Sequence, residues 1–490
     1  MPPRPNLFAI PAVMIVGIAA SCFAQQVPPA PPQQTPMHHH ETMRTIEPVY
    51  PQLGRTQEQA QGKLFTLDDA QRLAAASNPT LRQAETEIRA AKARTRQAGL
   101  YPNPSIGYTG DEIRGGSVNG GKQGFFVEQT VVTGGKLDKT RNVFEQEGRV
   151  AQLEAEEQKT RVETSVKIEF YEVLAAQELL DLRRALTHIG QLHLQSQEQL
   201  ARTGQVDETE ELETEIDVQR LHLAALEQEN VLREHWRRLA DLIGQPELQQ
   251  ATVAGDLEHD WPEINEEKTL ATIAQQSPAS RIADASAMRA YAQVLQTKSE
   301  VIPDINLLGG LEHNYEPIGA GPLATGWQGF AEVSVQVPIY NRNQGNIEEA
   351  QAEQDRAQLE KQRIQLVFRE QAASMLDEYA TAKLVATQYR EEILPRARKA
   401  NALMTEKYGQ MQASYPRMLE TRRKNFQLEA EYVRALETVW ATSLALQGFL
   451  LTDGLAAPTS PLNLEHFMPE TKTPKASPAA VLPQMTLPSQ

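Results

Sequence analysis

The side chains with the clearest potential for chemistry lie in a short run from Met37 to Met43, which reads MHHHETM. Its imidazole and thioether groups are ligands for soft or borderline metal ions. The surrounding segment 25–63 is rich in Pro and Gln and carries no pattern that could bury a core, so it is expected to be flexible. Because histidines in a flexible segment usually bind metal only incidentally, we predict no metal site and no cofactor, and His38 to His40 remain an open question.

The remaining candidates for chemistry give no catalytic pattern. The sequence has no Gly-rich phosphate loop, and no Ser or Cys nucleophile comes with a supporting His and acid. His188 and His193 fall in one helical run but are five residues apart, which places them on different helix faces. The sequence therefore predicts a protein that is not an enzyme.

The charge balance narrows the class of partner. The formal net charge is -16, and there is no basic stripe of the kind that contacts nucleic acid phosphates. The surplus of carboxylates is expected either to favour cations in an aqueous interior or simply to keep a large exported protein soluble.

The N-terminal residues 1–24 resemble an export signal. Arg4 supplies a positive charge, and the apolar stretch from Ile10 to Ala20 is too short to cross a bilayer as a helix. Two routes of processing remain open: cleavage after Ala24, or lipidation of Cys22. Cys22 is thus a possible lipid anchor, and as the sole cysteine it leaves no intrachain disulfide.

The elements that follow occur twice in tandem. Gly124-Phe125 recurs as Gly329-Phe330, and Gly204-Gln205 recurs as Gly409-Gln410, each 205 residues later. A duplication explains this constant offset better than chance does. We predict a first repeat at 64–245, a linker at 246–265, a second repeat at 266–455 and a disordered Pro-rich tail at 456–490.

Long helices dominate each predicted repeat. Proline is absent between Pro104 and Pro246, and apolar residues recur at helical spacing from about 136 to 203. Such a helix would be about 100 Å long. A returning helix follows each glycine break, and a third helix, predicted at 67–100 and again at 266–301, is expected to continue the returning helix end to end.

Short alternating segments lie at the other end of each repeat. The sequence predicts strands at about 104–113 and 124–133 in the first copy, and at about 303–313 and 328–337 in the second. Each has about the 9 to 11 residues that a tilted membrane-spanning strand needs. Four strands cannot close a barrel in lipid, so several copies of the chain must pool their strands.

This layout resembles the TolC family of outer-membrane efflux channels over roughly residues 64–455. The motifs that carry the resemblance are duplicated in a fixed order, and they are Asn78-Pro79, Tyr101-Pro102-Asn103-Pro104, Thr133-Gly134-Gly135-Lys136, Pro338 to Ile347, Ile393-Leu394-Pro395 and Tyr408-Gly409.

The resemblance implies a mainly α fold with a small β part, in which long antiparallel helices and four transmembrane strands are repeated in tandem. It further implies a homotrimer with a 12-stranded β-barrel in the lipid of the bacterial outer membrane and an α-helical tunnel in the periplasm. The segment Pro338 to Ile347 is similar to outer-membrane subunits of cobalt-zinc-cadmium type heavy-metal efflux systems, which work with a periplasmic adaptor and an inner-membrane proton-driven pump of the resistance-nodulation-division class.

The expected function is thus a passive, gated conduit for heavy-metal cations. Two alternatives stay open: the same channel serving multidrug efflux or protein secretion, and a structural periplasmic coiled coil without a pore.

The resemblance also places the aperture and the adaptor-docking surface at the hairpin tips, 204–206 and 409–414. The residues assigned to them are Gly204, Gln205, Val206, Gly409, Gln410 and Met411.

Two further features flank these tips. Gly190 and Pro395 occupy equivalent positions before them and are expected to bend the helices. The acidic stretch from Asp207 to Glu213 is expected either to hold the mouth open by repulsion or simply to start a helix favourably.

Overall fold

The computed structural model of this chain describes residues 64–112, 121–203, 207–317 and 324–458. All of them belong to one compact unit, Arg55–Gln490. The described part is mainly helical with one small antiparallel sheet. None of its helices combines the length and the apolar character that are needed to cross a membrane.

Several expectations fall on other residues. The predicted signal peptide with Cys22, the histidines His38 to His40, the first hairpin tip from Gly204 to Val206, and nearly all of the predicted C-terminal tail lie outside the described residues.

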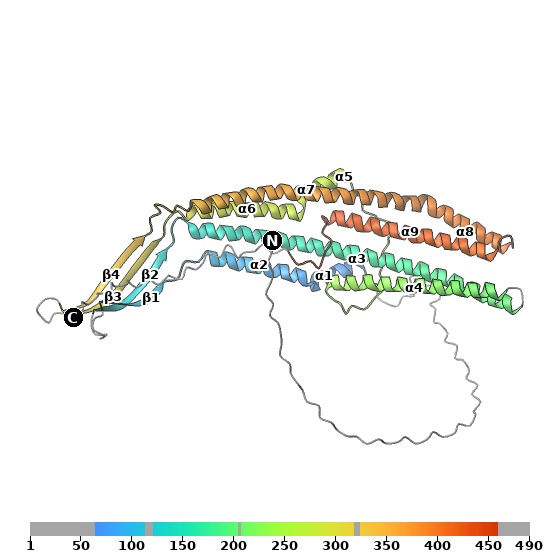
Figure 1. Ribbon diagram of the computed structural model, residues 1–490, viewed down its shortest axis with the longest axis horizontal. Helices are drawn as coiled ribbons and strands as arrows, with labels where there is room; N and C mark the ends of the chain where they lie inside the picture. The colour runs from blue at the N-terminus through green and yellow to red at the C-terminus, as the bar shows by residue number, and fades with distance from the viewer. Residues whose placement is uncertain (1–63, 113–120, 204–206, 318–323, 459–490) are drawn as a thin grey trace, which may run out of the picture. The chain divides into compact units, whose positions relative to one another are not determined.

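The described elements follow the same order in the two halves of the unit: two short helices, two strands, a long helix and a returning helix (Figure 1). In the first half these are α1 (Leu67–Ser77), α2 (Pro79–Ala98), β1 (Ser105–Asp111), β2 (Lys122–Val131), α3 (Lys136–Arg202) and α4 (Glu208–Ile243). In the second half they are α5 (Glu266–Gln276), α6 (Pro278–Ser299), β3 (Ile305–Pro317), β4 (Ala324–Val335), α7 (Gln344–Gln388), a π-helical turn η2 (Tyr389–Ile393), α8 (Leu394–Gly409) and α9 (Tyr415–Gln447).

The predicted third helix of each half is wrong in one respect, because each is broken into two helices. Pro79 and Pro278 each begin a new helix, and the residues before them, Asn78 and Ser277, have ψ angles of 125° and 144°. A proline ring excludes the preceding residue from helical geometry, so the chain must turn there. Both preceding residues then cap the new helix with their side-chain oxygens.

The end-to-end continuation is present in the first half. The Asn78 amide donates a hydrogen bond of 2.7 Å to the carbonyl oxygen of Leu242, in the last turn of α4. Helix α2 therefore starts where α4 ends, and both pack along α3, which is 67 residues long.

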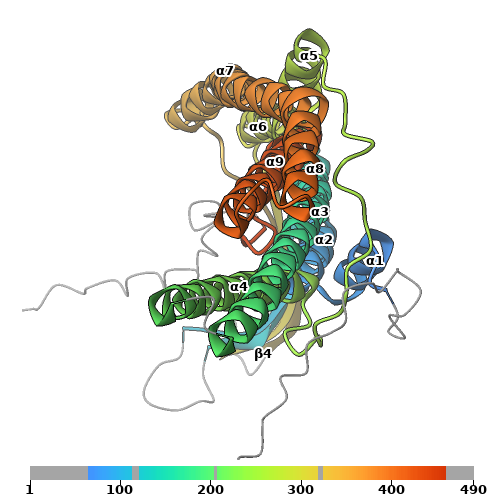
Figure 2. The ribbon, with the colours of Figure 1, turned by 90° about the vertical axis from the view of Figure 1, so that its right-hand side faces the viewer.

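The second half repeats this arrangement around α7, against which both α6 and α9 pack. Figure 1 shows the four strands at one end of the helices and the turn between α8 and α9 at the other. Figure 2, which looks along the helices, shows the α3–α4 pair beside the α8–α9 pair.

The core lies where α3, α4, α7 and α9 meet the segment 246–265. The rings of Tyr171 and Trp440 stack with their centroids 3.9 Å apart, and Phe170 and Leu436 are buried beside them. The carbonyl oxygen of Leu257 accepts hydrogen bonds from the indoles of two tryptophans, at 2.9 Å from Trp261 and 3.0 Å from Trp440. The segment between the halves is therefore part of the core and ties the two hairpins together.

Candidate functional site

The sheet has two faces of opposite character. Its strands pair antiparallel in the order β1-β2-β3-β4, so paired residues share a face. One face carries large apolar side chains that are exposed in the single chain: Ile106, Tyr108, Phe125, Val127, Leu307, Leu311, Trp327, Val333 and Val335. Exposure of a contiguous apolar face of this kind marks a surface that another apolar phase or chain covers.

The other face of the sheet is polar, with two aromatic rings laid over glycines. It carries Glu128, Glu312 and Glu332 among other polar groups. A Cβ on Gly107 would lie 2.4 Å from the Phe126 ring, so only glycine fits beneath that ring. The alternation predicted from the sequence therefore separates an apolar face from an acidic one.

The second hairpin tip is formed by the turn between α8 and α9. The break expected from the sequence lies at Gly409-Gln410-Met411; in the structure Gly409 is the last helical residue and Met411 has the positive φ, 59°. The amides of Met411 and Gln412 donate to the carbonyls of Tyr408 and Lys407, at 2.9 and 2.8 Å. This paired hydrogen bonding closes the helix with the left-handed residue two positions after the glycine, so local geometry is set by the bonds and not by residue type alone.

Met411 is almost fully exposed at this tip, with 95% of its surface accessible. Gln410 points back along α8, where its amide donates to the Glu406 carboxylate at 3.1 Å. An exposed thioether at the end of a hairpin is an adaptable apolar contact for another protein.

The helix that leads to the second tip changes its hydrogen-bonding pattern just before Pro395. Between Tyr389 and Ile393 the backbone forms the π-helical turn η2, and α8 then begins at Leu394. Proline lacks an N–H and its ring collides with the carbonyl of the residue four positions earlier, so the widened turn accommodates it.

This π-helical turn is braced from several sides. The Tyr389 hydroxyl donates to the Glu431 carboxylate on α9 at 2.7 Å. The Arg390 guanidinium lies over the Trp261 ring, 4.6 Å from its centroid. The π-helical turn is therefore held by α9 and by the segment between the halves.

Gly190 has a different local role from Pro395. It lies within α3, which stays α-helical from Lys136 to Arg202. A Cβ on Gly190 would lie 2.9 Å from Cδ1 of Leu221 on α4, and the Thr187 hydroxyl donates to the Leu221 carbonyl at 3.1 Å. Gly190 thus permits the close approach of α3 and α4.

The two hairpins are linked across their facing helices by an ion pair. Arg423 on α9 and Asp217 on α4 are 2.8 Å apart between Nη2 and Oδ2. The pair borders a cavity of about 470 Å³ between α3, α4 and α9, lined by Leu182, Leu186 and Leu221 among others. A cavity beneath an ion pair leaves room for the hairpins to move relative to one another.

The acidic stretch beside the first tip starts α4. Asp207 holds the N-cap position, and Glu208, Glu210 and Glu211 lie in the first turn. Carboxylates at a helix N-terminus interact favourably with its dipole, which agrees with the simpler of the two expectations.

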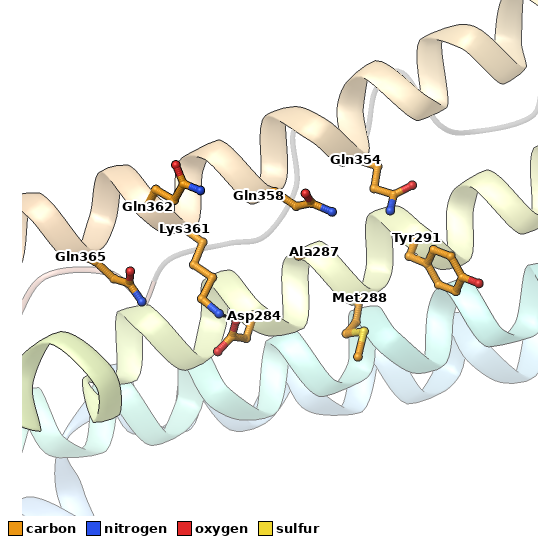
Figure 3. Close-up of a pocket in the computed structure, with 9 residues that line it drawn as sticks. All are labelled: Asp284, Ala287, Met288, Tyr291, Gln354, Gln358, Lys361, Gln362 and Gln365. Carbon is orange, nitrogen blue, oxygen red and sulfur yellow. Dashed lines mark ion pairs between the residues drawn. The ribbon is translucent and has the colours of Figure 1, made fainter.

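A second groove, of about 790 Å³, runs between α6 and α7 (Figure 3). Gln354, Gln358 and Gln362 of α7 face Met288 and Tyr291 of α6 across it. Lys361 and Asp284 close one side with an ion pair of 2.5 Å. Amides, a thioether and a phenol offer contacts to another helix and no catalytic chemistry.

Sequence reasoning missed a cluster of ionisable groups, because its members lie on different helices. The Nδ1 atom of His235 on α4 lies 2.9 Å from Oε1 of Glu169 and 3.4 Å from Oε2 of Glu172, both on α3. These hydrogen bonds raise the pKa of His235 to about 10. Burial raises the pKa of Glu169, while the His235 hydrogen bond lowers that of Glu172 in spite of its burial. The i, i+3 spacing of the two glutamates was the only signal available in the sequence.

Burial also shifts other carboxyl groups of α3. The pKa of Glu154 rises to about 8, through desolvation and then through the charge of Glu157. The pKa of Glu178 rises to about 7, through desolvation and then through Glu258 and Asp256. Part of the formal negative charge is therefore neutralised by protons near pH 7.

Comparison with known proteins shows which family and which folds this chain resembles. Residues 71–245 match the family model described as outer membrane efflux protein. The chain is similar to the cobalt-zinc-cadmium resistance protein CzcC of Cupriavidus metallidurans, at 23% identity over 84% of this chain and 94% of that protein. The family-model match, over residues 71–245, covers the first half of the described unit. The second half repeats the helices and strands of the first.

Solved structures show the same fold. CusC matches with a TM-score of 0.63 and 16% identity, covering 78% of this chain and 91% of CusC. The Campylobacter jejuni CmeC outer membrane channel matches with a TM-score of 0.59 and 15% identity, covering 80% and 87%. VceC of Vibrio cholerae matches with a TM-score of 0.61 and 15% identity, covering 79% and 96%.

The fold is thus the one seen in solved outer-membrane efflux channels. The resemblance to this family that the sequence predicts is confirmed, by the family match over residues 71–245 and by the similarity to CzcC.

Proposed function

We propose that this chain is the outer-membrane channel subunit of a tripartite efflux system for heavy-metal cations. Three copies form one passive, gated conduit, and an inner-membrane proton-driven pump of the resistance-nodulation-division class with a periplasmic adaptor delivers the cargo.

The observation that carries the proposal is the open four-stranded sheet with one exposed apolar face. Strands β1 and β4 form its two edges, and neither edge pairs with another strand among the described residues. Unpaired backbone groups cost several kcal/mol each in lipid, so the edges need partners there. Three copies supply twelve strands, which close a barrel with the apolar face outward and the acidic face toward the lumen.

Exposed apolar residues on the helices support the same assembly. Leu223 on α4 is 58% exposed, and Leu359 and Leu366 on α7 are 63% and 68% exposed. In a trimer these faces and the groove between α6 and α7 pack against neighbouring protomers and form the wall of the tunnel.

A cationic cargo agrees with the lumen-side chemistry of the sheet. Glu128, Glu312 and Glu332 share the polar face, and a ring of such groups from three protomers favours cations over anions. The relative CzcC is named as a cobalt-zinc-cadmium resistance protein, which supports metals over organic compounds as the cargo.

The hairpin tips are the proposed site of gating and of adaptor docking. Gly409, Gln410 and Met411 lie at the described tip, and Gly204, Gln205 and Val206, which are outside the described residues, are assigned to the equivalent tip by their sequence position. The bend at Pro395 and the close helix contact at Gly190 set how the hairpins taper toward the mouth.

The test combines transport with conductance. A deletion strain is grown on zinc, cobalt, cadmium, nickel, copper and silver salts, and separately on dyes, detergents and antibiotics. Sensitivity to a group of metals alone supports the proposal. Sensitivity to organic compounds alone assigns the channel to multidrug efflux, and a purified protein without single-channel conductance in planar bilayers overturns the channel itself.

A further inference from the structure

The strongest unassigned cluster in the described part of the chain is formed by Glu169, Glu172 and His235. Its three ligand atoms, one from each side chain, all lie within 4.8 Å of one another. Glu169 is buried and the other two side chains are half-buried. The residues come from two neighbouring helices that pack along their length, α3 and α4, so the helix packing fixes the spacing of the donors.

The cluster holds more acceptors than one imidazole can satisfy. Both carboxylates face the same ring nitrogen, Nδ1, at 2.9 and 3.4 Å. A single N–H shared between two carboxylates leaves the longer contact weak. Arg238 on α4, whose charge acts on Glu172, is paired with Glu234 at 2.5 Å and is more than half exposed.

A fourth acidic side chain faces this group from the other hairpin. Glu437 on α9 interacts electrostatically with Glu172 and His235, and with Arg434 on its own helix. It makes no hydrogen bond or ion pair to the other described residues. The stacked pair Tyr171 and Trp440 holds α9 against α3 one turn away. Glu437 is therefore a half-buried carboxylate without a hydrogen-bonded partner beside two carboxylates and an imidazole.

We propose that Glu169, Glu172 and His235 bind a first-row divalent cation such as Zn²⁺ or Co²⁺. Glu437, which lies outside this group of ligand atoms but close enough for its charge to act on it, moves in to complete the site, so that the ion joins the first hairpin to α9. Carboxylate oxygens and an imidazole nitrogen form a ligand set that such ions accept. In a tetrahedral site with metal–ligand distances of ~2.0–2.2 Å, ligand atoms lie ~3.3 Å apart. The measured separations of 2.9 and 3.4 Å bracket that value.

The metal takes the place of the proton between His235 and the glutamates. Binding releases that proton from Nδ1, and the carboxylates become ligands in place of hydrogen-bond acceptors. Because the donors come from α3, α4 and α9, the ion cross-links the wall of the conduit. It is a resident ion and is distinct from the transported cargo, so the inference does not depend on which cargo the channel carries.

The test uses the full chain, purified in detergent and treated with a chelator. The histidines His38 to His40 are replaced by Ala in the reference protein, because they would also bind metal. Isothermal titration with Zn²⁺ is expected to show one site per chain, and Mg²⁺ is expected to bind at least ~10-fold more weakly. Co²⁺ is expected to give a visible absorption spectrum of a four-coordinate site with nitrogen and oxygen ligands.

Variants of the cluster separate this site from adventitious binding. Glu172→Gln and His235→Gln are expected to weaken Zn²⁺ binding at least ~10-fold. They are also expected to abolish the rise in melting temperature that Zn²⁺ causes in the reference protein. His259→Gln is the matched control, since the side chain of His259 is exposed and pairs with Asp256 of the same segment at 2.8 Å. The Zn²⁺ affinity of His259→Gln is expected to equal that of the reference protein.

Glu437→Gln keeps the three central ligands and is expected to lower the affinity without removing the site. This variant remains informative if a change at His235 prevents folding. Absence of Zn²⁺ binding to the reference protein, or unchanged affinity in both Glu172→Gln and Glu437→Gln, overturns the proposal.

Discussion

Arg423 on α9 forms an ion pair with Asp217 on α4, and this contact joins the two helical hairpins beside a cavity. Both side chains are about two-fifths exposed, so the pair is partly screened by solvent. In the proposed channel we expect this pair to restrain the two hairpins from separating.

Replacement of Arg423 by Ala is expected to favour the open state. A partly exposed ion pair contributes ~0.2–1 kcal/mol, which corresponds to a ~1.4- to 5-fold higher open-to-closed ratio per protomer. Single-channel recording in planar bilayers measures this ratio. Lys424→Gln is the control, because Lys424 pairs with Glu420 within α9 alone; equal effects of the two variants would show that the hairpin contact does not restrain opening.

Replacement of Pro395 by Ala is expected to convert the π-helical turn into regular α-helix. Alanine restores the N–H and lacks the ring for which the widened turn makes room, so regular helical hydrogen bonds can form and the variant is expected to melt at a higher temperature and to conduct differently. Thermal unfolding and bilayer conductance check the two effects. Pro416→Ala serves as the control, since that proline lies in the first turn of α9 where no N–H is missed. Unchanged conductance and transport in Pro395→Ala contradict the role of the bend.

Replacement of Gly190 by Ala is expected to destabilise the contact between α3 and α4. The added Cβ would lie 2.9 Å from Leu221 and 3.4 Å from Val218, and overpacking of this kind costs ~1–3 kcal/mol. Gly148→Ala on the same helix is the matched control, because nothing lies within 4 Å of its Cβ position. The control is expected to gain up to ~1 kcal/mol from helix propensity. Chemical denaturation measures the free energy of unfolding of both variants. A Gly190→Ala protein that is more stable than the parent would contradict close packing at this contact.

Replacement of Met411 by Gly is expected to stabilise the second tip. A non-glycine residue in the left-handed region pays ~1–2 kcal/mol, which glycine avoids. Hydrogen exchange of the Gln412 amide, which donates to Lys407, is expected to slow. Met411→Asn tests the side chain separately, because Asn tolerates this backbone while losing the exposed thioether. Weaker binding of the periplasmic adaptor to both variants supports docking at this tip, and undiminished binding argues against it.

Stability is expected to depend on pH through Glu178, whose pKa is raised from 4.5 to about 7 mainly by burial. Above pH ~4.5 the unfolded chain loses this proton while the folded protein retains it, so the free energy of unfolding falls as pH rises toward 7 and then levels off. Glu178→Gln removes this dependence. The melting temperature of the variant minus that of the parent is therefore expected to increase between pH 5 and 8. If the two proteins gave parallel curves of melting temperature against pH, Glu178 would be excluded as the cause.

Much of this fold could be read from periodicity, because long proline-free runs and period-two alternation act locally. The strand pair of each half and the long helices α3 and α7 lie where those patterns predict them. The breaks at Asn78 and Ser277 were missed although the following prolines were visible, since apolar periodicity continues across them. The break at Gly409-Gln410-Met411 was visible in the sequence, but which of the three is left-handed depends on which amides find carbonyls when α8 closes, and it is Met411.

The sequence by itself determined the duplicated layout, the helical and stranded segments and the two faces of the sheet, because these depend on neighbours within a few residues. Only the tertiary structure decided that His235 meets Glu169 and Glu172, that Asp217 meets Arg423 and that the segment 246–265 joins the core. Those contacts join residues dozens to hundreds of positions apart, so they depend on how the helices pack, which no local pattern records.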